Sequence, residues 1–175
     1  MKNTTTKTIA ENAIVAAIYF ALTLASTPFS FGLIQFRISE MLMLLCFFRK
    51  DYVIGLTIGC LLSNAAMSTS VLGSTGWIDM IVGTSATLIS GLIMPYCKRL
   101  FIASLVPVIF NGVFVGLELS YVFELGNVWV CIGFVSLGEL VCISILGYIL
   151  VMILRKKYNN FDKLIGAKIN LEVKW

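Results

Sequence analysis

The sequence contains no histidine and few charged residues: Asp, Glu, Lys and Arg make up only 13% of the chain. Soluble domains average about 25%. The chain is also 59% hydrophobic, with a mean hydropathy of +0.96. This composition predicts an all-α integral membrane protein, because its apolar stretches are long enough to cross a bilayer as helices. The 175 residues leave no room for a separate soluble domain, so we predict one membrane domain over residues 1–175.

Two further features are absent from the sequence, and each absence argues against a kind of functional site. The five cysteines show no Cys-x-x-Cys spacing, and without histidine they offer no convincing ligand set for zinc or haem. No glycine-rich loop ends in Gly-Lys-Ser or Gly-Lys-Thr, so the chain is not expected to hydrolyse ATP itself. We therefore expect neither a metal nor a cofactor. The net charge of +4 does not indicate a nucleic-acid partner, because the basic residues flank the apolar stretches.

Six apolar stretches predict membrane-spanning helices at about residues 10–27, 37–48, 52–70, 77–96, 101–123 and 128–154. The second stretch is short. Residues 28–36, which precede it, are too apolar for a simple solvated loop. We therefore expect this loop to dip into the membrane beside the second helix.

Basic residues lie at every second flank of these stretches: at the N-terminus, at 49–50, at 98–99 and in the C-terminal cluster. The intervening turns contain no Lys or Arg. By the positive-inside rule, both termini are cytoplasmic. A basic N-terminus, an apolar run and Ala25-Ser26-Thr27 could instead form a cleaved signal peptide. Glu11, just before the apolar run, argues against cleavage.

An alanine ladder runs along the first predicted helix and consists of Ala13, Ala17, Ala21 and Ala25. A four-residue period places these side chains on one stripe, where their small size lets another helix approach closely. Small residues recur with the same spacing within 55–63 and 112–120, where we expect packing inside the bundle. The longer stripe on the first helix favours a surface for a partner protein.

Arg37 is the only one of the thirteen Lys and Arg residues that cannot be assigned to a cytoplasmic flank. Glu40 follows at i+3, so the two side chains can pair on one helix face. A charged pair inside a membrane is costly and normally faces the bundle interior or a water-filled cavity. Two interpretations stay open: a structural ion pair that locks two helices together, and a pair that borders a binding site.

The other polar residues within the helices fall at a similar depth, in the outer half or near the middle of the bilayer, at about 1.5 Å of rise per residue. They are Asn64, Asp79, Asn111, Glu118 and Glu139. The inner halves of the helices contain no acid or base, so this layer predicts an aqueous pocket that opens outward. Four carboxylates, counting Glu40, face one guanidinium. The ligand should therefore carry positive charge or several hydrogen-bond donors.

Four motifs follow one another along the chain: Ile34-Gln35-Phe36-Arg37-Ile38-Ser39-Glu40, Gly55-Leu56-Thr57-Ile58-Gly59-Cys60, Asp79-Met80-Ile81-Val82-Gly83-Thr84, and Pro107-Val108-Ile109-Phe110-Asn111-Gly112 with Glu118. Together with the six predicted helices and the alanine ladder, they resemble the QueT family. This family belongs to the substrate-binding S-components of energy-coupling factor (ECF) transporters. The resemblance covers about residues 8–155.

The resemblance implies uptake of a queuosine precursor, 7-aminomethyl-7-deazaguanine, across the bacterial cytoplasmic membrane. It also implies a transmembrane scaffold subunit and two cytoplasmic ATPases as partners. In such complexes the S-component captures substrate outside and then reorients in the membrane to release it inside. The alanine ladder would contact the scaffold, and the loop between the first two helices would cover the site.

The polar layer suits this ligand. One carboxylate can pair with the aminomethyl cation, another can accept both donors of the guanine-like edge, and an asparagine amide can donate to the ring oxygen. We expect Glu118 and Glu139 to be the two acids and Asn111 to serve the ring oxygen, with Asp79 and Glu40 at the rim.

Aromatic side chains could stack on the base, and the candidates are Phe36, Trp77, Tyr121 and Trp129. Trp and Tyr at the outer rim are also the usual interfacial anchors of membrane helices, so both interpretations stay open.

Two alternative functions remain. The chain could be an S-component for another vitamin or nucleobase-like compound. It could also belong to a different class, as a membrane-embedded enzyme or a transporter that needs no partner. An enzyme would require a nucleophile–base pair or a metal-binding set, which the sequence does not offer, and we expect no enzymatic activity.

Overall fold

The computed structural model describes residues 2–30 and 34–167, and every regular element within these ranges is a helix. The elements are α1 (Lys2–Ala25), α2 (Thr27–Ser30), η1 (Ile38–Met43), α3 (Leu44–Phe48), α4 (Tyr52–Leu72), η2 (Gly73–Thr75), α5 (Gly76–Ile93), η3 (Met94–Tyr96), α6 (Leu100–Tyr121), α7 (Val128–Glu139), η4 (Leu140–Gly147), α8 (Tyr148–Lys157) and α9 (Phe161–Leu164). The first three η segments are 3-10 helices, and η4 is a π-helix. The all-α prediction is confirmed.

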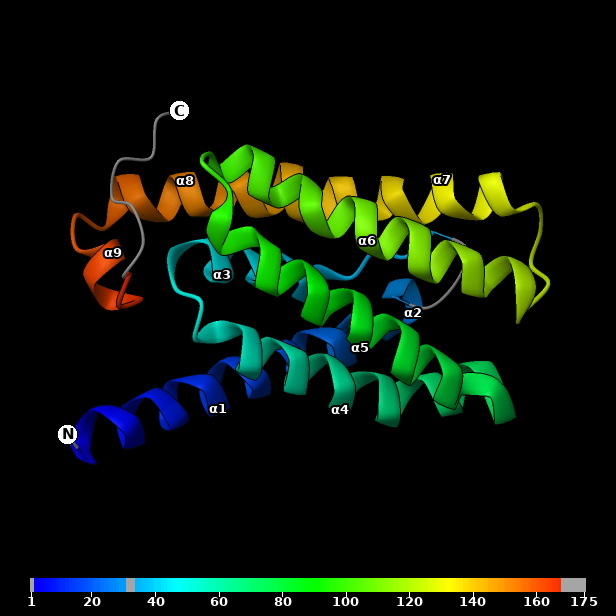
Figure 1. Ribbon diagram of the computed structural model, residues 1–175, viewed down its shortest axis with the longest axis horizontal. Helices are drawn as coiled ribbons and strands as arrows, with labels where there is room; N and C mark the ends of the chain where they lie inside the picture. The colour runs from blue at the N-terminus through cyan, green and yellow to red at the C-terminus, as the bar shows by residue number, and fades with distance from the viewer. Residues whose placement is uncertain (1, 31–33, 168–175) are drawn as a thin grey trace.

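The long helices run side by side along the long axis of the molecule (Figure 1). The N-terminus, the turn between α3 and α4, and α9 lie at one end, whereas the turn between α6 and α7 lies at the other. The long helices pack in chain order: α1 packs on α4, α4 on α5, α5 on α6, and α6 on α7. This order forms a curved layer of helices.

Four of the described helical spans are long and apolar enough to cross a membrane: Thr6–Ala25, Gly76–Tyr96, Leu100–Tyr121 and Val128–Lys157. Two further apolar helices, Ile38–Phe48 and Tyr52–Ala66, are shorter. Each of the six predicted stretches thus corresponds to a helix. The count of six crossings, the cytoplasmic placement of both termini and the single-domain assignment remain predictions.

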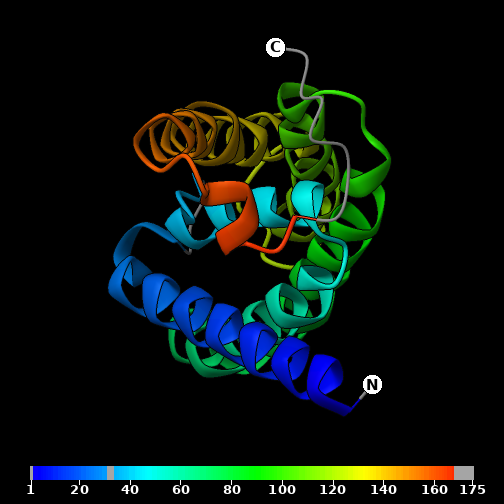
Figure 2. The ribbon, with the colours of Figure 1, turned by 90° about the vertical axis from the view of Figure 1, so that its left-hand side faces the viewer.

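The short segment η1–α3 lies in the middle of the bundle, with the longer helices around it (Figure 2). Met43, Leu44, Cys46 and Phe47 are buried on every side and form the centre of the main hydrophobic core. A segment enclosed in this way needs an apolar surface all round, which explains why residues 41–48 are all apolar. The core therefore supports the residues just before it, including Arg37.

The loop predicted at 28–36 is described only in part, because residues 31–33 lie outside the described residues. On either side of this gap, Ser30 and Gln35 are buried. The backbone of Gln35 packs so tightly on Gly138 of α7 that a Cβ at this glycine would overlap it. The described part of the loop is therefore held inside the protein.

Two predicted helix ends differ from the structure. α1 begins at Lys2 rather than near residue 10, because polar residues continue a helix beyond the apolar stretch that hydropathy detects. Thr8 in this polar turn accepts a hydrogen bond from Arg49 Nη2 at 3.0 Å, which anchors the extension. The last helical span continues to Lys157 instead of 154 and contains the unpredicted π-helix η4.

The small-residue patterns in the third and fifth stretches pack inside the bundle, as predicted. A Cβ at Gly59 of α4 would lie 3.0 Å from the carbonyl oxygen of Ala16 in α1. A Cβ at Gly116 of α6 would lie 2.6 Å from Ile132 Cα in α7. Any larger residue at these two positions would push the paired helices apart.

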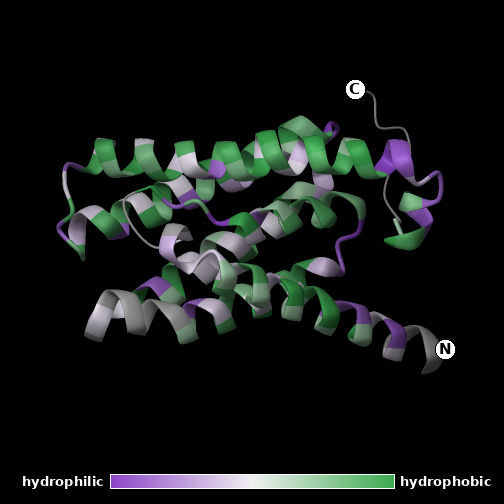
Figure 3. Ribbon diagram, turned by 180° about the vertical axis from the view of Figure 1, so that it is seen from behind, coloured by the Kyte–Doolittle hydropathy of each residue, from purple (hydrophilic) through white to green (hydrophobic). Residues whose placement is uncertain are grey.

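Large apolar side chains lie on the outside of the bundle, as in a protein whose solvent is lipid. Ile54, Ile109 and Ile153 each expose more than half of their surface, and they come from three different helices. Figure 3 shows hydrophobic residues along most of α6 to α8, with hydrophilic residues near the N-terminus and the turns. This distribution agrees with a membrane protein.

We call the end of the bundle that holds Arg49 and α9 the basic end. Arg49 Nε donates to Asp51 Oδ2 at 3.0 Å, and its Nη1 pairs with Glu11 Oε2. Tyr52 Oη donates to the carbonyl oxygen of Ile165 at 2.9 Å. These contacts tie α1, α4 and the segment after α9 together.

Candidate functional site

A polar layer of buried side chains lies within the bundle and is contributed by five different segments. Its members are Arg37, Glu40, Asn64, Asp79, Asn111, Glu118 and Glu139. None of them is more than 4% exposed. All five acids and amides predicted for the site, and the predicted Arg37 and Glu40, are therefore interior residues rather than surface ones.

Arg37 lies at the centre of this layer. Its Nη2 is 3.5 Å from Asp79 Oδ2 of α5, and its Nε donates to the carbonyl oxygen of Ser30 at 3.4 Å. Glu118 interacts electrostatically with Asp79 and Arg37, and Glu139 interacts with Glu40 and Arg37. The guanidinium of Arg37 therefore interacts with acids from three helices, α5, α6 and α7.

α4 and α5 meet closely beside this ion pair. Asn64 Nδ2 donates to the backbone oxygen of Asp79 at 3.3 Å. A Cβ at Gly83 would lie 2.8 Å from Asn64 Nδ2 and 3.6 Å from Arg37 Nη1, so only glycine leaves room for both side chains. The asparagine therefore orients the turn of α5 that carries Asp79.

Glu40 interacts with α1. Tyr19 Oη donates a hydrogen bond to Glu40 Oε1, and the other carboxylate oxygen, Oε2, has no hydrogen-bond partner among the described residues. Asp79 forms an ion pair with Arg37. The predicted Arg37–Glu40 pair stays a prediction.

Glu139 and Asn111 bring α7 and α6 together in the same layer. Asn111 Nδ2 donates to Glu139 Oε1 at 2.9 Å. Within the described part of the chain, Glu139 Oε2 and Asn111 Oδ1 have no partner, and neither carboxylate oxygen of Glu118 has one. Buried polar atoms are normally hydrogen-bonded, so this group of unsatisfied acceptors indicates a place for a ligand or for water.

Three of the four aromatic candidates are largely exposed. Trp77, Tyr121 and Trp129 are 56%, 73% and 77% exposed, and Phe36 packs against the hydrophobic core. Such exposure near helix ends favours the interfacial-anchor interpretation for the first three. Their stacking on a ligand stays a prediction.

The sequence analysis did not single out Tyr19, which donates a hydrogen bond to Glu40 of the polar layer. Its signal is nevertheless present, because polar residues recur along α1 at Asn12, Tyr19, Thr23 and Ser26, on the side opposite the ladder. Spacings of three, four and seven residues mark one helix face. The alanine ladder, on which the sequence analysis relied, lies on the opposite face of α1.

The alanine ladder faces outward. Ala13, Ala17, Ala21 and Ala25 are all exposed, whereas neighbouring Ala16 is buried. The exposed alanines therefore do not pack within the described bundle. This placement is compatible with a helix of another protein lying along α1.

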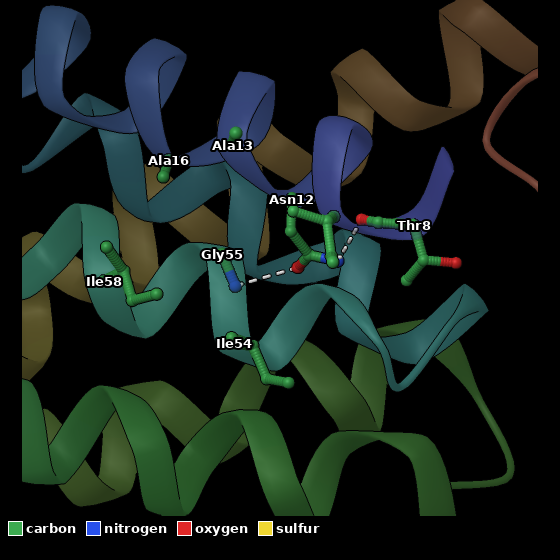
Figure 4. Close-up of a pocket in the computed structure, with 8 residues that line it drawn as sticks. Thr8, Asn12, Ala13, Ala16, Ile54, Gly55 and Ile58 are labelled. Carbon is green, nitrogen blue, oxygen red and sulfur yellow. Dashed lines mark hydrogen bonds between the residues drawn. The ribbon is translucent and has the colours of Figure 1, made fainter. Parts of the chain in front are cut away.

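A groove of about 290 Å³ lies beside the ladder, between α1 and α4 (Figure 4). Its walls are almost entirely apolar, and Ile9, Ala13 and Ile58 contribute to them. Asn12 closes its base, because Oδ1 accepts from the backbone N–H of Gly55 at 2.8 Å. The amide is therefore satisfied internally, and the groove offers apolar surface to an occupant.

Fold and site together define a helical membrane protein with a buried, acid-rich polar layer and an exposed small-residue helix face. Residues 9–156 match the family model of the QueT transporter, and the chain belongs to this family.

One similar protein is the queuosine precursor transporter QueT of Lactococcus lactis subsp. cremoris (strain MG1363). It is 45% identical over 91 residues, which are 51% of this chain and 50% of that relative. The chain thus matches about half the length of this curated relative. No solved structure matches the chain.

Proposed function

We propose that the protein is the substrate-binding S-component of an ECF-type importer in the bacterial cytoplasmic membrane, and that its substrate is 7-aminomethyl-7-deazaguanine. Membership of the QueT transporter family and the similarity to the queuosine precursor transporter of Lactococcus support this proposal. The single observation that carries the substrate class is the set of buried acceptor atoms without partners, above all both oxygens of Glu118.

The available atoms match the ligand's donors. Glu118 offers two carboxylate oxygens, Glu139 and Glu40 offer one each, and Asn111 and Asn64 offer their amide oxygens. A deazaguanine with an aminomethyl group carries an ammonium and several ring and amino N–H donors, so it can satisfy such a set. Glu118 and Glu139 are the proposed partners of the cation and of the base edge.

The ring oxygen of the ligand requires a donor. Asn111 Nδ2 donates one amide hydrogen to Glu139, and its second amide hydrogen is a proposed donor to the ring oxygen. Thr84 carries a buried hydroxyl without a partner in the described structure. A hydroxyl can both donate and accept, so Thr84 joins Asn111 as a candidate for the ring oxygen.

Titration calorimetry on the detergent-solubilised protein tests this function. We expect 7-aminomethyl-7-deazaguanine to bind more tightly than the same ring without the aminomethyl group. Mass spectrometry of the small molecule that co-purifies with the protein provides an independent check. Co-purification of a different vitamin or base would show that the proposed substrate is wrong, while the chain would still be an S-component.

The proposed partners are a transmembrane scaffold and two cytoplasmic ATPases. The exposed ladder and the adjacent groove support a helix-docking face on α1. We further propose six membrane crossings with both termini inside, which the distribution of basic residues supports. The protein alone should bind substrate in liposomes without accumulating it. Concentrative uptake by this chain alone would instead identify a partner-independent transporter.

A further inference from the structure

The two faces of α1 have different surroundings. The exposed face carries the alanine ladder. The buried face carries Tyr19, Thr23 and Ser26, and all three are less than 5% exposed. One helix therefore borders both the proposed partner surface and the interior of the bundle.

Hydrogen bonds connect the buried face of α1 to the segment that carries Arg37 and Glu40. Thr23 Oγ1 donates to Ser39 Oγ at 2.7 Å, and Tyr19 Oη donates to Glu40 Oε1. The two bonds lie one helical turn apart and reach neighbouring residues of η1. The position of η1 is thus coupled to α1 through side chains rather than through the backbone.

The bond from Tyr19 acts on a carboxylate that is incompletely satisfied. Glu40 is fully buried, and its Oε2 has no partner in the described structure. A phenol that holds Oε1 fixes the plane of the carboxylate and leaves Oε2 available. Hydrogen bonds to an ionised acceptor are also among the stronger ones in proteins.

We propose that Tyr19 is a positioning residue of the substrate site: it orients Glu40 so that Oε2 accepts a hydrogen bond from the ligand. This inference rests on the proposed function. It assigns a substrate-site role to the helix whose outer face carries the alanine ladder.

A double-mutant cycle tests the inference, with 7-aminomethyl-7-deazaguanine as the titrant and Tyr19→Phe, Glu40→Gln and the double variant as proteins. Phenylalanine removes the hydroxyl and keeps the ring. We expect Tyr19→Phe to weaken binding about tenfold in the parent, the loss of one hydrogen bond to a charged group. In the Glu40→Gln background it should have no further effect, because the group it orients has already been changed.

Two comparisons sharpen the cycle. Tyr52→Phe is the matched control, because it removes a buried tyrosine hydroxyl that donates to Ile165 at the basic end. It should leave affinity unchanged. Glu40→Gln alone should weaken binding at least as much as Tyr19→Phe does, because it replaces the acceptor that the phenol orients. If Tyr19→Phe does not yield folded protein, parental affinity of Glu40→Gln would still overturn the inference.

The outcomes separate the two hypotheses. Parental affinity of Tyr19→Phe, or an equal loss in both backgrounds, would show that the tyrosine is merely structural and overturn the inference alone. An absence of binding by the parent protein would overturn the proposed function, and this inference with it.

Discussion

Two groups of charges in this protein differ in how completely they are paired. At the basic end, Arg49 engages both Glu11 and Asp51. In the polar layer, the single guanidinium of Arg37 lies among four buried carboxylates, and oxygens of three of them have no partner in the described structure. The ion pairs of Arg49 are formed within the protein itself, whereas the polar layer retains carboxylate oxygens without a partner in the described structure.

Under the proposed function, this difference separates the structural role of the Arg49 ion pairs from the binding role of the polar layer. A charge group whose members satisfy one another stabilises the fold and gains little from a ligand. An acid-rich group inside a membrane protein is costly until a cation or several donors arrive. Variants in the two groups should therefore differ in their effects on the free energy of unfolding and on ligand affinity.

The largest effect should come from Arg37→Gln. Breaking a buried ion pair by removing one partner typically costs about 3–5 kcal/mol, because the other charge stays buried. Unfolding in detergent, followed by circular dichroism, measures this loss. A cost no larger than that of Arg49→Gln at the basic end would contradict the central role of Arg37.

Glu118→Gln and Glu139→Gln should each weaken binding of 7-aminomethyl-7-deazaguanine by more than tenfold, which corresponds to about 1.4 kcal/mol or more. Glutamine keeps the shape of the side chain but loses the charge and adds competing donors. Titration calorimetry provides the measurement, and Glu11→Gln at the basic end is the matched control. If both variants bind like the parent, the two acids are structural and the comparison fails.

Arg49→Gln should lower the free energy of unfolding by about 1 kcal/mol and leave ligand affinity unchanged. The loss is modest because Glu11 and Asp51 are each 24% exposed, so water screens the interaction. Unfolding and titration on the same preparation test both parts. A clear loss of affinity would mean that the basic end contributes to the substrate site.

The smallest effect on the isolated chain should come from Ala21→Leu. The side chain is exposed, so unfolding should change by less than about 0.5 kcal/mol, and ligand affinity should be parental. Recovery of a complex with the scaffold should nevertheless fall, since a larger residue prevents close helix approach. Val130→Leu, an enlargement on the exposed side of α7, is the control. Normal complex recovery with Ala21→Leu would show that the ladder is not part of the partner surface.

Depth along each helix predicted which polar residues share the layer, because an acid in an apolar stretch has to be satisfied somewhere. Depth did not predict which side chains pair with one another. The ion pair between Arg37 and Asp79 joins two segments that lie far apart in the sequence. The bond between Asn111 and Glu139 likewise depends on the rotation of α6 against α7. Such rotations are set by packing across the bundle, which local spacing does not contain.

The helical stretches themselves were largely predictable, because long apolar runs in a weakly charged chain have few alternatives. Hydropathy failed at the start of α1, where polar residues prolong the helix, and gave no sign of η4. A π-helix differs from an α-helix in hydrogen-bond register rather than in composition. Apolar content alone cannot distinguish the two.

The π-helix η4 makes the length of its segment as important as its composition. It begins at Leu140, directly after Glu139, and closes each hydrogen bond one residue further along than an α-helix does. Val151 follows Glu139 by twelve residues, and in a continuous α-helix this separation would place the two side chains about 120° apart. Glu139 and Val151, both buried now, could then no longer face the interior together. The wider turns of η4 take up the extra residue, so rewinding this segment as an α-helix of the same length would turn Glu139 away from the side that α8 buries.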